Sequence, residues 1–430
     1  MTFVNNLVSN PENLKLPDRI KRVLLLVMKN RFVSTLLAKV CPVQTFLIQD
    51  KRNGGDSGIN ILFFGHIELA HYFSKLFFSR KSKILPLGKT PYSNMSTRLS
   101  ETTADIAIVS VHGAFSGFLS QEGFLISPLI RSTIDLSNSL NVFYTRLSEG
   151  RRRDIHVIEK LGYTYEITRE PGKFNLFYKK MYLPYTLKRH QESSSPTSFS
   201  EMKKYLLNGG LLLVKLNDEY VSGLLYQIYD NQRVLAKCTG AYERRDGCYA
   251  KKAIPAALYF LILWSKQQGY DEIDLRYCVS SFMKDGVLFY KREWGVDVRP
   301  SSDIIYSRVH GLKLGNFGSS VRQFLIDNPV IFENSLSLKG LVFLNNEKPT
   351  EGRMKNLHRL YYTPGLSDLV VISCLGDDPT GSSLKIVSEG KLIKEHPVDE
   401  GTLSFLRFFT EVAPNESFDI YLIRGARDVI

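Results

Sequence analysis

Three consecutive strand-like runs joined by very short links constrain the fold of this chain more than any other feature. The runs cover 211–216, 220–229 and 233–239 and are rich in Leu, Val and Tyr. Asn217-Asp218 and Asp230-Asn231 connect them, and such two-residue polar links favour tight antiparallel hairpins. The segment therefore predicts a three-stranded antiparallel meander.

Helices and one strand are predicted before the meander. The helices cover 137–162 and 173–190, with a strand over 163–169 between them. Ser198 and Glu201 then form an S-x-x-E capping box for a short helix over 199–208, which the glycines at 209–210 end. The region therefore combines helices with strands.

A buried helix is predicted directly after the meander. Residues 254–268 are apolar on nearly every side, Pro255 lies near the first turn and Gly269 follows the end, as expected for helix termini. An apolar run of about a dozen residues is too short to span a bilayer. A strand over 272–277 and a short helix over 285–294 follow it.

The length of 430 residues suggests about three domains. A composition of 43% hydrophobic and 23% charged residues excludes wholesale disorder and a membrane bundle. We predict a basic amphipathic segment (1–50), a first α/β half (51–150), a domain built around the meander (151–310) and an accessory domain (311–430). The first half is expected to hold strands over 59–64 and 104–111 and a helix over 68–78. The accessory domain is expected to hold strands over 369–373, 384–387 and 420–423 and a helix over 402–412.

Positive charge is concentrated at the N-terminal end. The first 100 residues hold 15 Lys and Arg against 5 Asp and Glu, a net of +10 within a total of +13. Such a surface attracts phosphate-bearing partners, which include anionic lipid and RNA. Residues 16–40 combine apolar side chains at helical spacing with basic ones, which predicts one amphipathic helix. That helix either packs on the protein core or lies on an anionic membrane surface without crossing it.

Cysteine and histidine usage indicates the compartment and the metal content. The five cysteines are scattered without CxxC spacing, which favours a reducing cytoplasm over a disulfide framework. The first residues do not read as a secretory signal, so we expect a cytoplasmic protein with peripheral membrane contact as an option. His66 and His71 are five positions apart and do not share a helix face, so no metal site is predicted.

The order of these elements, and several local sequences, resemble a GNAT-fold acyltransferase of the FemAB-like branch. The similarity rests on RRDIHVIEKLG at 152–162, on Phe177-Tyr178, Met181, Pro184, Gly240 and Gly269-Tyr270, and above all on Asp285-Gly286 with FYKREWG at 289–295. It covers about residues 137–296, and it implies that 151–310 is the catalytic domain. The resemblance implies an α/β (α+β) fold with a GNAT-like mixed sheet flanked by helices, in tandem, with a C-terminal accessory domain.

The resemblance also implies an activity. A protein of this kind moves an acyl group, here acetyl from acetyl-CoA or another acyl-CoA, to an amine or hydroxyl of a sugar, polysaccharide precursor or amino compound. Two alternatives stay open: a FemAB-type ligase that uses aminoacyl-tRNA, and a GNAT-fold binding module without catalysis. The basic N-terminal segment would suit tRNA and anionic lipid equally well.

A loop before the buried helix is the predicted site of the donor. A pyrophosphate is best held by backbone N–H groups at a loop-to-helix junction with cations nearby. The loop over 242–252 approximates the GNAT pyrophosphate pattern, although Tyr249 stands where that pattern has a small residue. The predicted donor-binding residues are Arg244, Arg245, Gly247 and Lys251. The competing interpretation is a solvated basic loop.

Direct acyl transfer needs a base, stabilisation of the oxyanion and a proton for the leaving group. Lys291 matches the lysine that the family places at the substrate, where it binds phosphate or the oxyanion. Tyr290 is the predicted proton donor, unless it only packs, and Asp274 the predicted proton acceptor, unless it caps a strand end or pairs with Arg276. Arg152 and Arg153 are predicted to bind a phosphorylated acceptor, with an exposed helix face as the alternative.

Overall fold

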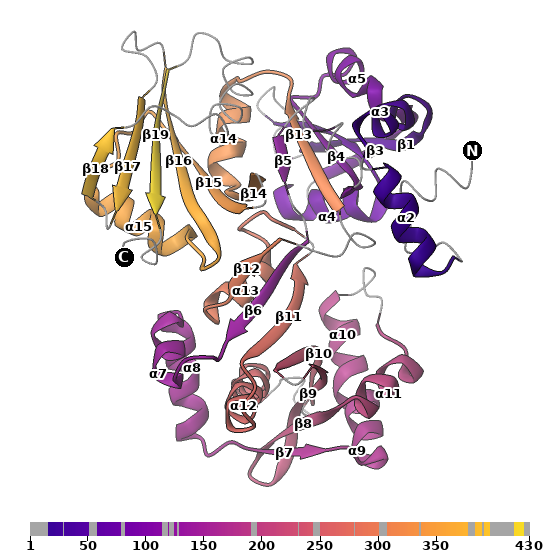
Figure 1. Cartoon of the computed structure of the whole chain (residues 1–430), viewed down its shortest axis with the longest axis vertical. Coiled ribbons are helices and arrows are strands. Elements are labelled where there is room, and N and C mark those ends of the chain that lie inside the picture. The colour runs from indigo at the N-terminus through magenta and orange to yellow at the C-terminus, as the bar shows by residue number, and fades with distance from the viewer. Residues whose placement is uncertain are drawn as a thin grey trace. The chain divides into compact units, whose positions relative to one another are not determined.

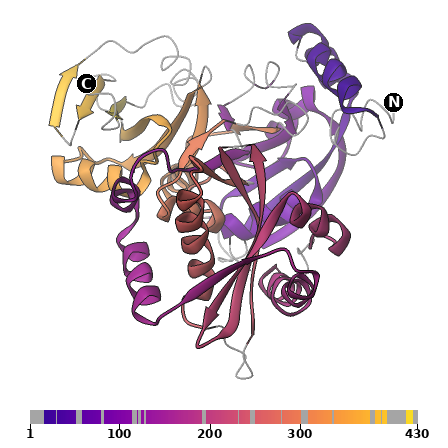
Figure 2. The same ribbon diagram turned by 60° about the horizontal axis from the view of Figure 1, so that its bottom comes forward.

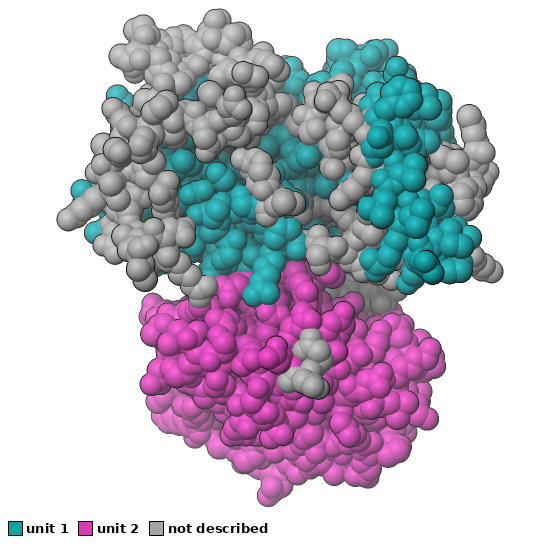
Figure 3. Space-filling view, viewed as in Figure 1, with its two compact units in different colours: residues 1–130, 278–288, 298–430 teal, residues 131–277, 289–297 magenta. Residues whose placement is uncertain are grey.

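The computed structural model describes residues 16–28, 30–50, 58–78, 82–113, 119, 124–126, 129–190, 196–230, 232–243, 250–278, 280–300, 308–334, 337–376, 383–388, 391–395 and 417–424. The chain forms two compact units (Figure 3). Unit 1 comprises 1–130, 278–288 and 298–430, and unit 2 comprises 131–277 and 289–297. Three mixed sheets flanked by helices confirm the predicted α/β class.

The first sheet of unit 1 has the order β3-β1-β2-β4-β13-β5 (Figure 1). Its strands are β1 (Pro42–Asp50), β2 (Asn60–Phe64), β3 (Ser82–Pro91), β4 (Ile106–His112), β5 (Phe124–Ile126) and β13 (Arg308–Leu314). The helices that follow β2 and β3 are α4 (Ile67–Phe78), η2 (Tyr92–Asn94) and α5 (Met95–Glu101). The strands predicted at 59–64 and 104–111 and the helix at 68–78 are confirmed, whereas β1 and β3 were not predicted. The predicted boundary at 310–311 falls inside β13.

The N-terminal segment forms two helices, α2 (Asp18–Met28) and α3 (Arg31–Val40), so the expectation of one helix over 16–40 is wrong. Asn30 separates the two helices. Its side-chain oxygen accepts the backbone N–H of Phe32 at 3.0 Å and caps α3. Leu25 and Met28 are buried in a core shared with the first sheet. One face of this segment therefore packs on the protein itself.

A second sheet of unit 1 has the order β14-β15-β16-β19-β17-β18. Its strands are β14 (Val330–Asn334), β15 (Ser337–Asn345), β16 (Leu366–Gly376), β17 (Ser383–Ser388), β18 (Lys391–Glu395) and β19 (Ser417–Arg424), with the helices α14 (Ser319–Asp327) and α15 (Glu351–Tyr361). Three predicted strands lie within β16, β17 and β19, and the predicted helix at 402–412 lies outside the described residues. Apolar side chains of this sheet, including Phe332 and Phe343, share one cluster with Phe63 and Phe73 of the first sheet and α4.

The sheet of unit 2 has the order β12-β6-β11-β10-β9-β8-β7. Its strands are β6 (Ile130–Asp135), β7 (Thr164–Thr168), β8 (Gly209–Leu216), β9 (Glu219–Asp230), β10 (Arg233–Ala241), β11 (Glu272–Cys278) and β12 (Asp297–Arg299). The antiparallel meander β8-β9-β10 is confirmed. Asn217 and Asp218 both have positive φ, of 51° and 61°, which is the tight hairpin turn that the sequence predicted.

Helices lie on both faces of this sheet (Figure 2). They are α7 (Leu140–Arg146), α8 (Glu149–Lys160), α9 (Pro171–Leu176), the π-helix η4 (Phe177–Tyr182), α10 (Leu183–His190), α11 (Phe199–Leu207), α12 (Ala253–Gln267) and α13 (Gly286–Glu293). The buried helix α12 packs on β8, β9 and β10. The element order is the one that the GNAT resemblance implied. Within the described ranges, no helix is both long and apolar enough to cross a membrane.

Two helices, α7 and α8, take the place of the single helix predicted over 137–162, so the predicted extent is wrong. The break falls at Leu147-Ser148, where the Ser148 hydroxyl accepts the N–H of Arg151 at 3.2 Å and begins α8. Serine at this position satisfies a backbone donor that a helix start leaves open. Gly162, with φ of 71°, ends α8 as the sequence indicated.

Candidate functional site

Two parallel strands of unit 2 pair over only a short stretch. The described ladder between β10 and β11 consists of Arg233 with Glu272, Val234 with Ile273 and Leu235 with Asp274. β10 then continues to Ala241 and β11 to Cys278. The strands therefore leave their common ladder at the level of Asp274, where backbone N–H and C=O groups of both become available to other partners.

Both strands are distorted at this level. The register of β10 against β9 shifts between Ala236 and Cys238, which is a β-bulge at Lys237. In β11, Arg276 has a left-handed backbone with φ of 66°, and its N–H donates to Asp274 Oδ1 at 2.7 Å. A left-handed backbone is costly for a residue with a Cβ, and such conformations gather at functional sites. The end of the ladder is thus a strained point of the sheet.

The carboxylate of Asp274 is held on both oxygens. Arg131, on β6, donates to Asp274 Oδ2 from Nε at 3.0 Å and from Nη2 at 2.7 Å, while Oδ1 accepts the Arg276 N–H. The side chains of Asp274 and Arg131 are 13% and 21% exposed. The ion-pair partner of Asp274 is therefore Arg131, and Arg276 contributes its backbone.

Lys291 lies beside the left-handed backbone of Arg276, which we call the kink of β11. Its side chain extends from α13, is buried, and donates from Nζ to the carbonyl oxygens of Arg276 at 3.0 Å and Tyr277 at 3.1 Å. Asp274 fixes the N–H of Arg276 and Lys291 fixes its C=O. The structure thus brings two of the predicted catalytic residues to opposite sides of one peptide segment.

Further ionisable side chains surround the bulge of β10. The Lys237 ammonium lies 4.0 Å from the centroid of the Tyr205 ring, and burial, followed by the charge of Arg276, lowers the pKa of Lys237. Burial likewise raises the pKa of the Cys238 thiol. Tyr205 donates to Glu201 at 2.5 Å, and burial together with this bond raises the pKa of Tyr205 to about 12. Lys237 was not predicted from the sequence, where its one signal is a cation in the middle of a largely apolar strand.

Tyr290 belongs to a second cluster, built by α8 and α13. Burial raises the pKa of Tyr290, and the guanidinium carbon of Arg151 lies 4.8 Å from its ring centroid. Arg151 also pairs with Asp154 at 2.7 Å and with Glu293 at 2.5 Å. Arg151 was not predicted from the sequence, whereas its neighbours Arg152 and Arg153 were. The spacing of Arg151 from Ile155 and Ile158, which are buried on the same helix face, is the signal that would have found it.

Arg152 and Arg153, which were predicted to bind a phosphorylated acceptor, each contact a group of the protein itself. Arg152 donates from Nη1 to the carbonyl oxygen of Leu147 at 2.7 Å, and so bonds the backbone where α7 ends. Arg153 is 74% exposed and pairs with Glu149 at 3.7 Å, one helical turn away. Both are exposed on α8, as the alternative of an exposed helix face expects.

The predicted donor loop is described in part. Arg244, Arg245 and Gly247 lie outside the described residues, whereas Lys251 is exposed and its carbonyl oxygen accepts the Tyr163 hydroxyl. Lys252, with φ of 65°, stands at the N-cap of α12, and the first turn of that helix holds no acidic residue. The positive end of the α12 dipole therefore lies beside Lys251 and Lys252.

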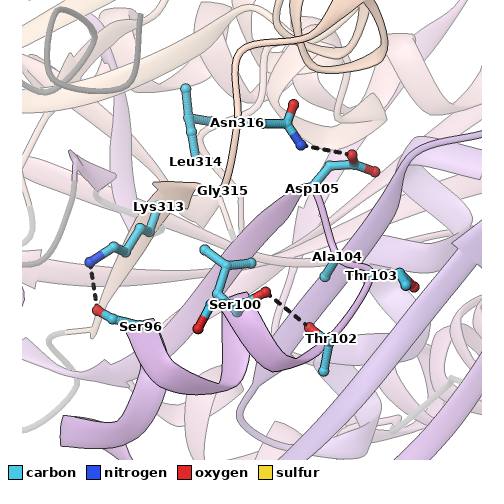
Figure 4. Close-up of a pocket in the computed structure, with 11 residues that line it drawn as sticks. Ser96, Ser100, Thr102, Thr103, Ala104, Asp105, Lys313, Leu314, Gly315 and Asn316 are labelled. Atoms are coloured by element: carbon cyan, nitrogen blue, oxygen red, sulfur yellow. Dashed lines mark hydrogen bonds between the residues drawn. The ribbon is translucent and has the colours of Figure 1, made fainter.

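A cavity of about 430 Å³ lies in unit 1, between α5 and the end of β13 (Figure 4). Its walls carry the side chains of Ser96, Ser100, Thr102, Thr103, Asp105, Lys313 and Asn316. Lys313 donates to Ser96 at 2.6 Å and Asn316 to Asp105 at 3.1 Å. Many of its polar groups thus already bond to one another. Over the described residues, no group of three or more His, Cys, Asp or Glu could hold a metal ion.

Comparisons with known proteins give partial structural similarities. No family model and no curated protein matches the chain. L-PGS from Bacillus licheniformis is 13% identical over 64% of this chain and 83% of its own, with a TM-score of 0.33. FemX is 12% identical over 61% and 83%, with a TM-score of 0.35. A GNAT family acetyltransferase from Elizabethkingia anophelis with acetyl-CoA bound is 17% identical over 35% and 95%, with a TM-score of 0.22.

Proposed function

We propose that this protein is an acyltransferase that moves an acyl group, acetyl from acetyl-CoA, to an amine or hydroxyl of a sugar, polysaccharide precursor or amino compound. The observation that carries the proposal is the early end of the β10–β11 ladder beside Asp274, Arg276 and Lys291. An extended chain that lies along a strand edge is held by main-chain hydrogen bonds. The amide-containing arm of coenzyme A has the groups to make them.

The phosphates of the donor would lie at the start of α12. The N-terminus of a helix attracts anions through its free N–H groups and its dipole. The loop before α12 adds the cations of Arg244, Arg245 and Lys251, and Gly247 lets the backbone approach a phosphate closely. Because β10 leads into this loop, the arm and the phosphates of one donor can follow a continuous stretch of chain.

In the transfer step, the acceptor nitrogen or oxygen forms a bond to the acyl carbonyl carbon and the bond from that carbon to sulfur breaks. We assign Asp274 to accept the proton that the acceptor loses. Tyr290 donates a proton to the departing sulfur. The positive charge of Lys291, fixed at the kink of β11, stabilises the oxyanion that forms between the two events.

Calorimetric titration with acetyl-CoA, and with desulfo-CoA as a non-reactive control, tests the donor. We expect saturable micromolar binding that Arg244→Ala/Arg245→Ala weakens at least tenfold. The matched control is Lys355→Ala/Arg359→Ala on α15, which removes the same charge from exposed positions. The control should bind as the native protein does.

Other results would overturn the coenzyme A assignment. Binding of an aminoacyl-tRNA in place of coenzyme A would favour the FemAB-type ligase. Binding of neither, by a protein that unfolds cooperatively, would favour a module without catalysis. Equal weakening by the α15 control would show that net charge, and not the donor loop, determines binding.

A further inference from the structure

The two N-terminal helices expose large apolar side chains. These residues are between 46% and 78% exposed: Ile20, Val23, Leu26 and Val27 on α2, and Phe32, Leu36 and Val40 on α3. Ile20, Val23 and Val27 follow the spacing of one helical face, and Phe32, Leu36 and Val40 follow that of another. Single exposed apolar residues are common, but a contiguous group indicates a binding surface. We call these seven residues the apolar stripe.

The residues of the apolar stripe do not belong to the buried core. Leu25 and Met28 of α2 and Ala38 of α3 are buried, and they anchor the two helices to the first sheet through their opposite faces. The helices thus satisfy their packing without the stripe. α2 lies at the periphery of unit 1 (Figure 1).

Basic side chains border the stripe. Arg19 and Arg22 on α2 and Lys39 on α3 are exposed. Asp18, the acidic residue of α2, is 71% exposed and lies 3.6 Å from Lys21. Apolar side chains flanked by exposed cations are typical of helices that lie in a membrane interface, where the cations meet anionic headgroups. The apolar stripe and the cations beside it together complement a surface with an apolar interior and an anionic rim, which is the chemistry of an anionic bilayer.

We propose that α2 and α3 dock this protein on the surface of a bilayer that contains anionic lipid. The apolar stripe enters the boundary between headgroups and acyl chains, and Arg19, Arg22 and Lys39 contact lipid phosphates. Helices of 11 and 10 residues are too short to cross the hydrocarbon layer, so the contact is peripheral. The proposal is independent of the donor and of catalysis.

Flotation of the full chain with vesicles tests the docking. Vesicles of phosphatidylcholine alone are compared with vesicles that also contain phosphatidylglycerol. We expect binding to the anionic vesicles that falls as salt is raised, because salt screens surface charges. Phe32→Ser/Leu36→Ser should lower the partition coefficient at least tenfold, and Arg22→Ala/Lys39→Ala should lower it on anionic vesicles only.

The matched control is Leu161→Ser/Leu360→Ser, which removes two exposed apolar side chains elsewhere, 42% and 46% exposed. The control should float as the native protein does, and all three double variants should keep the native unfolding temperature. Failure of the native protein to bind anionic vesicles would overturn the proposal, as would equal losses in the control. A concentration-dependent dimer that Phe32→Ser/Leu36→Ser abolishes, without vesicle binding, would instead assign the stripe to a second copy of the chain.

Discussion

Arg131 donates two hydrogen bonds to one oxygen of Asp274, from Nε at 3.0 Å and from Nη2 at 2.7 Å. The two residues are 143 positions apart and lie on β6 and β11. The other oxygen of Asp274 accepts the N–H of Arg276, whose carbonyl oxygen accepts Lys291. One carboxylate therefore joins a strand from the start of unit 2 to the kink at which the candidate site is built.

The Arg131–Asp274 pair should contribute measurably to stability. We expect a coupling free energy of about 1–3 kcal/mol from a double-mutant cycle of Arg131→Met and Asp274→Asn, because both partners are largely buried. The free energies come from denaturant unfolding. The exposed Glu149–Arg153 pair on α8 is the control and should give a coupling of about 0–0.5 kcal/mol. Equal couplings for the two pairs would contradict this account of the kink.

Replacement of Lys291 by Met should damage both folding and transfer. The carbonyl oxygens of Arg276 and Tyr277 would lose a buried donor, at a cost of about 1–3 kcal/mol in the free energy of unfolding. If the charge also stabilises the oxyanion, kcat and kcat/KM should fall by the same factor. Unchanged turnover of a verified substrate would remove Lys291 from the mechanism. Lys355→Met, at an exposed position of α15, is the control.

Tyr290→Phe separates a proton donor from a packing residue. The substitution keeps the aromatic ring beside Arg151 and removes only the hydroxyl. We expect turnover to fall by about 10²–10⁴ if the hydroxyl donates a proton. Because burial raises the pKa of Tyr290, native turnover should not decline at moderately alkaline pH through loss of this proton. Native turnover in the variant would show that Tyr290 only packs.

Glu166 on β7 should make unit 2 sensitive to acid. Its carboxylate lies 2.5 Å from Lys173 and 2.8 Å from Lys215, and the hydrogen bonds from these lysines lower the pKa of Glu166 to about 2. A depressed folded pKa gives stability that is complete above the ordinary value of 4.5 and is lost as the pH falls toward 2.

Glu166→Gln should therefore cost on the order of 1 kcal/mol at neutral pH, less as the pH falls toward 2, and nothing at still lower pH. The measurement is the free energy of unfolding of both proteins across this range of pH. Curves that run parallel down to the lowest pH would show that Glu166 titrates alike in the folded and unfolded chain.

Local signals predicted the centre of unit 2 well. The positive φ angles of Asn217 and Asp218 and the cap of Ser198 on α11 depend on neighbours in sequence, so the meander and its flanking helices could be found. Gly240 and Gly295, two glycines on which the resemblance rests, are required by the backbone around them. A Cβ on Gly240 would lie 2.6 Å from the backbone of Tyr182, and Gly295 has φ of 66°.

Helix breaks and polar strands were harder to predict. Hydrophobic periodicity continues across Asn30 and Ser148, so it concealed two caps that were present in the sequence. β3 is only partly buried over most of its length and has no clear alternation, because its pairing with β1 rather than its side chains defines it.

Of the residues at the candidate site, only those that belong to a sequence motif could be predicted. Asp274 and Lys291 could be chosen from the sequence, but the meeting of both at Arg276 depends on the kink of β11. Arg131 could not be found, because its partner is 143 positions away. Lys237 becomes notable only when Tyr205 and Arg276 lie beside it.

Hydrogen exchange of the backbone amides, with and without desulfo-CoA, tests the central claim most directly. If the donor lies along the diverging strands, the amides of 237–241 on β10 and of Arg276 and Tyr277 on β11 should exchange more slowly when it is bound. The amides around the unit 1 cavity, at 96–105, should be unaffected. Protection confined to the cavity, or no protection at all, would contradict the account.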